Sequence, residues 1–176
     1  MRVVAGEAGG RFLVAPEGTT TRPTSDRVRE SVFNMLVSLG ATEDARVLDL
    51  YAGSGALGIE ALSRGAATCV FVEQDRAAVE AIHENLETLG FDGRAKVVQA
   101  DVLTWVERNE SDFDLVLADP PYADEDWEPL LGSIHATTFV AESGNRLVPH
   151  PRWDVAREKK YGTTLVSVLT MKETSK

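Results

Sequence analysis

Residues 47–58 read Val47-Leu-Asp-Leu-Tyr-Ala-Gly-Ser-Gly-Ala-Leu-Gly58, an apolar run that passes through a glycine-rich loop into an apolar helix start. Gly53, Gly55 and Gly58 match the G-x-G-x-x-G pattern found where a parallel strand turns into a helix beneath a bound nucleotide. Glu73 lies 20 residues after Gly53 and ends the next apolar run, where such folds place an acid for ribose hydroxyls. The stretch indicates a Rossmann-like α/β fold. Taken alone, it does not identify the ligand.

From residue 45 onward, strand and helix patterns alternate. We expect strands at 45–51, 67–73, 95–99 and 113–118, and helices at 55–64, 75–89, 102–109 and 125–136. After residue 137 the pattern changes to strands at 138–142, 153–156 and 163–170, which we expect to complete the sheet through a closing hairpin. Continuous apolar strands alternating with helices predict a mostly parallel, seven-stranded sheet with helices on both faces.

Residues 1–40 precede this alternation and predict an N-terminal appendage. Residues 2–5 and 11–15 flank the glycine-rich residues 6–10, which indicates a β-hairpin. Thr24 or Ser25 is expected to cap a helix that runs to about Leu39 and stops at Gly40. We therefore expect one compact unit in which residues 1–40 form a hairpin and helix, and residues 41–176 form the α/β domain.

The bulk properties are those of a globular protein. The chain has 176 residues, 43% of them hydrophobic and 26% charged, and no leader-like or membrane-length apolar run, so we expect a soluble cytoplasmic protein without membrane contact. The net charge is −10, but residues 1–36 have five Arg against four acidic residues. Because phosphate contacts supply much of the affinity for nucleic acids, any such contact must be local and near the N-terminus.

Acidic residues stand at the ends of four successive expected strands, the edge at which open α/β sheets bind ligands. A carboxylate at Asp49 repels a pyrophosphate but attracts an ammonium or a sulfonium. S-adenosylmethionine matches this pattern, with its ammonium near Asp49, its ribose on Glu73 and its adenine near Asp101. We expect no metal. The expected cofactor-binding residues are Asp49, Tyr51, Ala52, Gly53, Gly55, Glu73, Gln74, Asp101, Val102 and Asp119.

The fourth acid begins the motif Asp119-Pro120-Pro121-Tyr122, directly after the apolar run 113–118. The prolines stiffen the strand end and leave nearby carbonyls as acceptors, the Asp119 carboxylate adds another, and Tyr122 supplies a flat ring. This set suits a planar group with an NH2: two acceptors bind its hydrogens while the ring stacks on its plane. We expect these four residues to form the catalytic corner. Trp127, five residues further, is either a core or rim aromatic or part of the same pocket.

The glycine loop and Asp-Pro-Pro-Tyr together resemble class I S-adenosylmethionine-dependent methyltransferases that modify exocyclic or amide nitrogens. Further segments resemble the RsmD-type 16S rRNA guanine-N2 methyltransferases: Gly9-Gly-Arg-Phe12, Arg22-Pro-Thr-Ser-Asp-Arg-Val-Arg-Glu-Ser-Val-Phe-Asn-Met-Leu36 and Arg157-Glu-Lys-Lys-Tyr-Gly162. The resemblance implies a Rossmann-like class I methyltransferase fold. It also implies methyl transfer to N2 of one guanine in 16S rRNA, on an assembling small subunit, with S-adenosylhomocysteine as the product and no obligate protein partner.

The expected mechanism needs no strong base. The target base leaves its stack and lies against Tyr122, while Asp119 and the Pro120 carbonyl accept hydrogen bonds from N2. Expected RNA-binding residues are Arg22, Thr24, Arg27, Arg29 and Tyr122. For the arginines a second interpretation stays open, in which they are surface charges paired with Asp26 and Glu30 across helical turns.

Rival functions differ in which features they leave unexplained. Transfer to adenine N6 or to a protein glutamine would use the same cofactor loop, but the chain has no separate recognition domain of the kind those enzymes use. A dinucleotide-dependent oxidoreductase would leave Asp49 and the proline motif without a role. A ribosome-assembly factor that only binds would not require a cofactor pocket.

Overall fold

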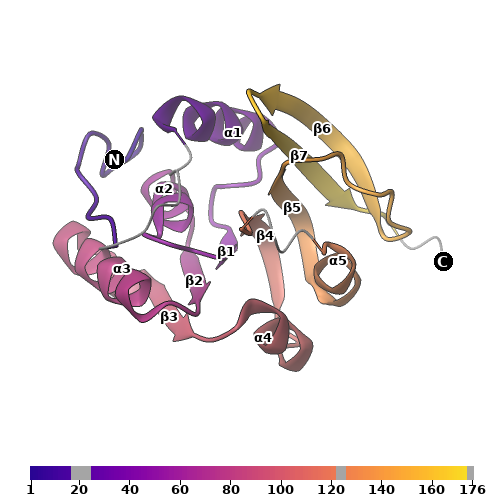
Figure 1. The fold of residues 1–176 in the computed structure, drawn as a ribbon. Coiled ribbons are helices and arrows are strands. Elements are labelled where there is room, and N and C mark those ends of the chain that lie inside the picture. The colour runs from indigo at the N-terminus through magenta and orange to yellow at the C-terminus, as the bar shows by residue number, and fades with distance from the viewer. Residues whose placement is uncertain (17–24, 122–125, 174–176) are drawn as a thin grey trace.

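Within the described residues, seven strands form one sheet in the order β3-β2-β1-β4-β5-β7-β6 (Figure 1). The structure, a computed structural model, describes residues 1–16, 25–121 and 126–173. Strands β1 to β5 run parallel, and β7 pairs antiparallel with β5 and β6. The prediction of a mostly parallel seven-stranded sheet completed by a hairpin is confirmed. The strands are β1 (Arg46–Leu50), β2 (Thr68–Glu73), β3 (Ala95–Gln99), β4 (Asp112–Ala118), β5 (His135–Ser143), β6 (Trp153–Tyr161) and β7 (Thr164–Met171).

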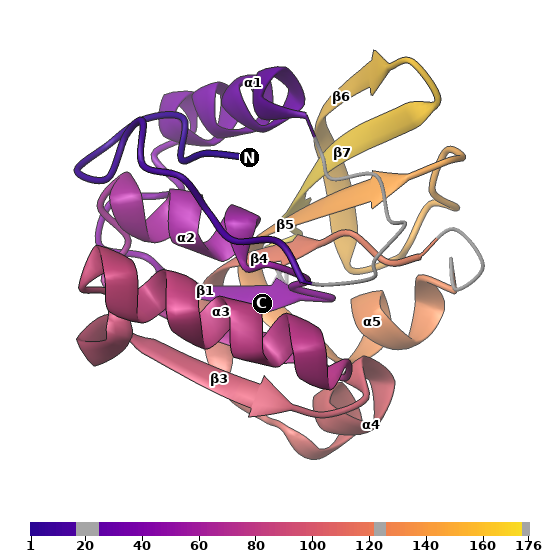
Figure 2. The same ribbon diagram turned by 60° about the vertical axis from the view of Figure 1, so that its left-hand side comes forward.

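Helices cover both faces of the sheet, as predicted (Figure 2). The first three pack on one face, where Phe71 and Leu117 are fully buried, and the last two pack on the other, around Val116 and Phe139. In the described part of the chain no helix has the length and apolar character needed to cross a bilayer. The helices are α1 (Asp26–Ser38), α2 (Ala56–Ser63), α3 (Arg76–Leu89), α4 (Val102–Arg108) and α5 (Glu128–Ser133), with a 3-10 turn η1 (Asp92–Arg94).

Two expectations about local structure need correction. The predicted helix at 125–136 is only Glu128–Ser133, because strand β5 begins at His135 and pairs with β4 from that residue onward. The predicted N-terminal hairpin has no regular strands: residues 1–3 and 10–13 share one antiparallel bridge, between Arg2 and Phe12, and three backbone hydrogen bonds. The predicted cap of α1 is confirmed, since the Ser25 hydroxyl accepts from the backbone N–H of Val28.

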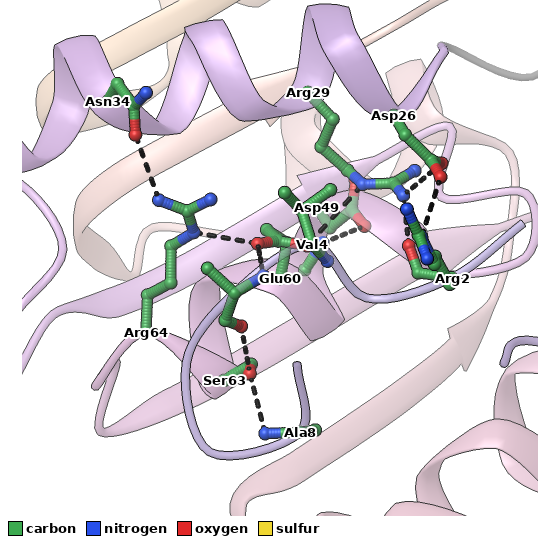
Figure 3. A network of polar contacts seen from close by, with 12 residues as sticks. Arg2, Val4, Ala8, Asp26, Arg29, Asn34, Asp49, Glu60, Ser63 and Arg64 are labelled. Carbon is green, nitrogen blue, oxygen red and sulfur yellow. Dashed lines mark hydrogen bonds and ion pairs between the residues drawn. The ribbon is translucent and has the colours of Figure 1, made fainter. Parts of the chain in front are cut away.

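A buried carboxylate attaches the N-terminal segment to the α/β domain (Figure 3). Glu60, on α2, is fully buried and accepts from the backbone N–H groups of Val4 at 2.8 Å and Ala5 at 3.0 Å. The same helix supplies Ser63, whose hydroxyl accepts from the N–H of Ala8 at 3.0 Å. These contacts join backbone donors to side chains more than fifty residues away along the chain. They attach residues 4–8 to α2 without a β-ladder.

Two arginines balance the charge of Glu60. Arg64 donates from Nε to Oε1 at 2.7 Å, and Arg29 Nε lies 3.5 Å from Oε2. The Arg29 side chain is fully buried and also binds Asp26 and the backbone carbonyl of Arg2. Because a buried charge is tolerated only when it is paired and hydrogen-bonded, this network must form together with the fold. It joins α1, α2 and the N-terminal segment.

Replacement of Glu60 tests this attachment. Glu60→Gln should lower the free energy of unfolding by about 3 kcal/mol, because Arg29 stays buried after losing one of its two counter-charges. Urea denaturation followed by circular dichroism measures the change. Glu80→Gln is the matched control: it breaks the exposed Arg76–Glu80 pair one turn apart on α3, and it should change the same quantity by less than about 0.5 kcal/mol. Equal losses in the two variants would contradict the role given to Glu60.

Candidate active site

A cleft of about 1810 Å³ lies along the carboxyl ends of β1, β2 and β4. The N-terminal turn of α1 and the turn between β6 and β7 complete its walls. Two predicted cofactor-binding residues, Asp49 and Gly55, are not among the described residues that line it. The predicted site residues that do line it are Tyr51, Ala52, Gly53, Glu73, Gln74, Asp101, Val102, Asp119, Pro120 and Pro121, together with Arg29.

The three glycines of the loop meet three different requirements. Gly53 has φ +57°, and a Cβ there would meet no described atom within 4 Å, so the loop leaves open space on the cleft side. Gly55 has φ +79° and precedes α2. A Cβ on Gly58 would lie 2.4 Å from the Phe71 ring, so this glycine allows α2 to pack closely on β2. Tyr51, at the end of β1, also has a positive φ of 58°, a conformation that non-glycine residues rarely adopt. Backbone strain of this kind often marks a functional site.

Glu73 fixes the loop from the neighbouring strand. Its Oε2 accepts from the N–H of Gly53 and its Oε1 accepts from the N–H of Asp75, each at 2.9 Å. Each carboxylate oxygen has a second lone pair, so Glu73 can still accept from the two hydroxyls of a ribose. The predicted role of Glu73 therefore fits the geometry, with a loop-holding role in addition.

The Asp49 side chain lies deeper in the protein than its expected place at the cleft surface. Its side chain is buried, and its Oδ2 accepts from the N–H of Gly58 at 2.9 Å, in the first turn of α2. Asp49 is therefore too deep to contact the ammonium group of a ligand directly. Burial raises the pKa of the Asp49 carboxyl well above its usual value, and the charges of Asp119, Glu73 and Glu142 raise it further, against the opposing hydrogen bond from Gly58. A cation bound nearby would favour the ionised form of Asp49.

Glu142 is a site residue that the sequence analysis missed. It is buried near the carboxyl end of β5 and lines the cleft. The signal was available, because the expected strand 138–142 ends at this acid in the same way as the four preceding strands end at theirs. With Asp49, Glu73 and Asp119 it gives the cleft a concentrated negative potential. A cation bound there would relieve the mutual repulsion of these carboxylates.

Asp101 has a structural role beside its predicted one. Its Oδ1 caps α4 by accepting from the N–H of Thr104 at 2.9 Å and from the Thr104 hydroxyl at 2.7 Å. Both hydrogen bonds lower the pKa of the Asp101 carboxyl, and the bond from the Thr104 N–H has the larger effect. The side chain is exposed, the buried Val102 follows it, and both residues line the cleft together with Gln74. An acceptor next to an apolar side chain suits an adenine ring and its amino group.

The proline corner closes the other half of the cleft. Asp119 is half-buried directly after β4, and Pro120 and Pro121 follow it on the cleft wall. Tyr122 lies outside the described residues, so its stacking role stays a prediction. Trp127 lines the cleft and also packs against the core, so it combines the two interpretations given for it. Its ring packs edge-on against Phe139 with centroids 6.3 Å apart, and its indole N–H has no hydrogen-bond partner among the described residues.

The residues predicted to bind RNA divide into three groups. Arg22 and Thr24 lie outside the described residues. Arg27 is exposed on α1, where it can contact a polyanion. Arg29 is a correction: its guanidinium is fully buried against Asp26 and Glu60, so it has no surface to offer to a phosphate. The open alternative of pairing with Asp26 is confirmed for Arg29, and its second partner is Glu60 rather than Glu30.

Metal binding finds no support in the side chains seen here. The described ranges contain no group of three or more His, Cys, Asp or Glu side chains arranged to hold a metal ion. The cleft acids instead bind backbone N–H groups, as shown for Asp49, Glu73 and Asp101.

Comparison with known proteins identifies the family. The family described as "Conserved hypothetical protein 95" matches residues 1–170. The chain belongs to this family. It is 37% identical to "Ribosomal RNA small subunit methyltransferase D" of Escherichia coli strain K12, over 92% of this chain and 85% of that protein. It is 40% identical to "Putative rRNA methyltransferase YlbH" of Bacillus subtilis strain 168, over 99% of this chain and 93% of that protein.

A solved structure confirms the fold predicted for the family. "Putative methyltransferase yhhF from Escherichia coli" is similar over 99% of both chains, with 32% identity and a TM-score of 0.87. The Rossmann-like class I methyltransferase fold is therefore confirmed, and so is the predicted membership in the RsmD family. The N-terminal segment and the cleft both lie within the matched residues.

The buried charge of Asp49 predicts an unusual pH dependence of stability. The folded state raises the pKa of this carboxyl, so it binds the proton more tightly than the unfolded chain does. Its contribution to the free energy of unfolding is therefore lost as pH rises above the unfolded value of about 4, until the folded carboxyl ionises. Asp49→Asn keeps the acceptor for Gly58 and should be more stable than the parent by a margin that grows with pH over this window. Urea denaturation across the pH range measures it.

Asp114→Asn is the control of opposite sign. The N–H of Arg46 lowers the pKa of Asp114, so this carboxylate stabilises the fold above pH about 4 and the stabilisation is lost in acid. Its replacement should reduce stability at neutral pH and matter least in acid. A parallel response of the two variants would contradict the assignment of Asp49.

Proposed function

We propose that the cleft binds S-adenosylmethionine and transfers its methyl group to the exocyclic N2 amino group of a guanine in 16S rRNA, on an assembling small subunit. The observation on which the proposal depends is the concentration of acids beside the glycine loop: Glu73, Asp119 and Glu142 line the cleft, and Asp49 is buried close to them. A site with this much negative charge favours a cationic nucleoside over a dinucleotide pyrophosphate. The names of the relatives, which specify rRNA of the small subunit, support the substrate class.

The chain's own residues divide the binding between them. The open space at Gly53 and the carboxylate of Glu73 suit the ribose, and Asp101 next to Val102 suits the adenine ring. Asp49 does not contact the ligand in this scheme, but it attracts the sulfonium through the field of the carboxylate group. When bound, S-adenosylmethionine supplies an electrophilic methyl group whose leaving group is a neutral thioether.

The proline corner orients the nucleophile. Asp119 and the Pro120 carbonyl accept the two hydrogens of the guanine N2 group, which turns the nitrogen lone pair toward the methyl carbon. That lone pair forms the new N–C bond, and the bonding pair of the C–S bond stays on sulfur. The nitrogen then loses one proton to Asp119 or to water, so no dedicated base is required. Catalysis comes from positioning and from acceptors fixed in advance.

The affinity for two ligands that differ by one charge tests the cofactor. S-adenosylmethionine is a sulfonium cation, and S-adenosylhomocysteine is its neutral thioether. Asp49→Asn should weaken S-adenosylmethionine on the order of tenfold while changing S-adenosylhomocysteine much less. In the parent protein the ratio of the two affinities should rise with pH as Asp49 ionises. Isothermal titration calorimetry measures both ligands, and a parent protein that binds neither of them would refute the cofactor assignment.

The identity of the product tests the reaction. Mass spectrometry of nucleosides from small subunits treated with the protein and S-adenosylmethionine should reveal N2-methylguanosine. Asp119→Ala should reduce single-turnover methylation by at least about a hundredfold, with S-adenosylhomocysteine affinity nearly intact. Methyl groups on adenine N6, or on protein glutamine, would replace the guanine assignment by one of the rival functions. Binding to subunits without any methyl transfer would indicate an assembly factor.

A further inference from the structure

The last part of the chain has a charge opposite to that of the whole. Residues 144–172 contain six basic and two acidic residues, in a protein whose net charge is −10. Three of the basic residues, Arg157, Lys159 and Lys160, are exposed on β6. This strand forms one edge of the sheet. Cations are therefore concentrated on a single edge of an acidic molecule.

These cations are not compensating nearby acids. Elsewhere on the surface, Arg46, Arg76 and Arg94 each form an ion pair with a carboxylate. By contrast, no carboxylate among the described residues lies within ion-pair distance of Arg157, Lys159 or Lys160. Within the part of the chain that the structure describes, Arg157 donates only to the adjacent carbonyl of Ala156, at 2.7 Å. An unpaired cation of this kind is free to bind an anion from outside the chain.

Lys159 connects this edge to the cleft. Its Nζ lies 5.2 Å from the centroid of the Tyr161 ring, and Tyr161 lines the cleft. The Tyr161 hydroxyl hydrogen-bonds the hydroxyl of Ser31 on α1. Arg27 stands one helical turn before Ser31 on the same face of α1 and is exposed. Arg27 and Lys159 thus belong to the two elements, α1 and β6, that meet at Tyr161, where the end of β6 lies beside α1 (Figures 1 and 2).

Alternation along the strand separates the three β6 cations. Arg157, Lys159 and Tyr161 are two residues apart, so they share the sheet face on which α1 packs. Lys160 points to the opposite face. The cationic ridge therefore consists of Arg27, Arg157 and Lys159.

Protection of an edge strand against aggregation is the simpler explanation for exposed lysines on β6. It would apply equally to β3, the strand at the opposite edge of the sheet. Strand β3 has one cation, Lys96, in the sequence Ala95-Lys-Val-Val-Gln99. Edge protection also does not account for Arg27, which is on a helix. The difference in positive charge between the two edge strands therefore favours ligand binding over edge protection as the reason for the β6 cations.

We propose that the cationic ridge binds the phosphate backbone of the RNA substrate and guides its target base past Tyr161 into the cleft. The inference depends on the proposed function for the identity of the substrate. Guanidinium and ammonium groups bind phosphates, and such contacts need only a local cluster of positive charge. An acidic protein can in this way hold RNA along one edge, while its carboxylates stay in the cofactor half of the cleft.

The test combines charge removal with a salt titration. A triple variant, Arg27→Gln, Arg157→Gln and Lys159→Gln, should bind deproteinised 16S rRNA at least about tenfold more weakly than the parent at low salt. The slope of log affinity against log salt should become shallower by about 2 to 3, because each lost phosphate contact releases about one counterion fewer. Filter binding between about 50 and 200 mM salt measures both quantities.

Two controls separate the ridge from general charge effects. Lys96→Gln removes the cation of the opposite edge and should leave both the affinity and the salt slope at their parental values. Binding of S-adenosylhomocysteine should be unchanged in the triple variant, since none of its residues lies in the proposed cofactor half. A lowered affinity for S-adenosylhomocysteine would mean that the substitutions disturb the fold, and the three single variants would then have to show the shallower slope instead.

Three outcomes would overturn the proposal. The first is a salt slope in the triple variant equal to that of the parent. The second is a parent protein without affinity for naked rRNA at about 50 mM salt. The third is a loss confined to assembled subunits, because the ridge would then contact a ribosomal protein. A methyl group found on another nitrogen, with the salt effect intact, would refute the proposed reaction but not the ridge.

Discussion

The buried carboxylate of Glu60 is the interaction on which the arrangement of the cleft depends. It binds two backbone donors of the N-terminal segment, Val4 and Ala5, and two arginines from α1 and α2. Residues at both ends of that segment, Met1 and Ala15, line the cleft. Removing a carboxylate and two guanidinium groups from water is costly, and the cost is offset only when all partners are present together. The network therefore holds this wall of the cleft in place only when all of its partners are present.

A second group of charges works against stability. Asp49 is buried near Asp119, Glu73 and Glu142, and these neighbours add to the cost of its ionisation. The Glu60 network has guanidinium partners, whereas the charges named around Asp49 are all negative. Sites of this type are often less stable than the surrounding fold because their charges are arranged for a ligand. A cationic ligand would supply the missing counter-charge, so binding and stability are coupled through the same carboxylates.

The sequence predicted the elements whose signals are local. The strand–glycine–helix stretch, the strands that precede the acids and the Ser25 cap depend on neighbours a few residues away, and the structure has each of these elements where it was expected, although Asp49 lies deeper than expected. The roles of Glu60 and Arg29 depend on partners 56 and 31 residues away. A charged residue inside an apolar helix pattern gives no local sign of such partners. The end of α5 was misjudged for a related reason, because pairing with β4 decides where β5 begins.

In the proposed function, the two charge groups allow the fold to serve two dissimilar ligands. Parallel strands β1 to β4 bring their carboxyl ends, and therefore their acids, to one half of the cleft. The antiparallel hairpin β6–β7 turns at Tyr161 to Thr164 and brings the positive edge strand to the other half. Because the hairpin joins the sheet on the far side of β5, the cations are kept away from the acids that would neutralise them. A cationic cofactor and a polyanionic substrate can then approach the same reacting atoms from opposite sides, each attracted by the half of the protein that would repel the other.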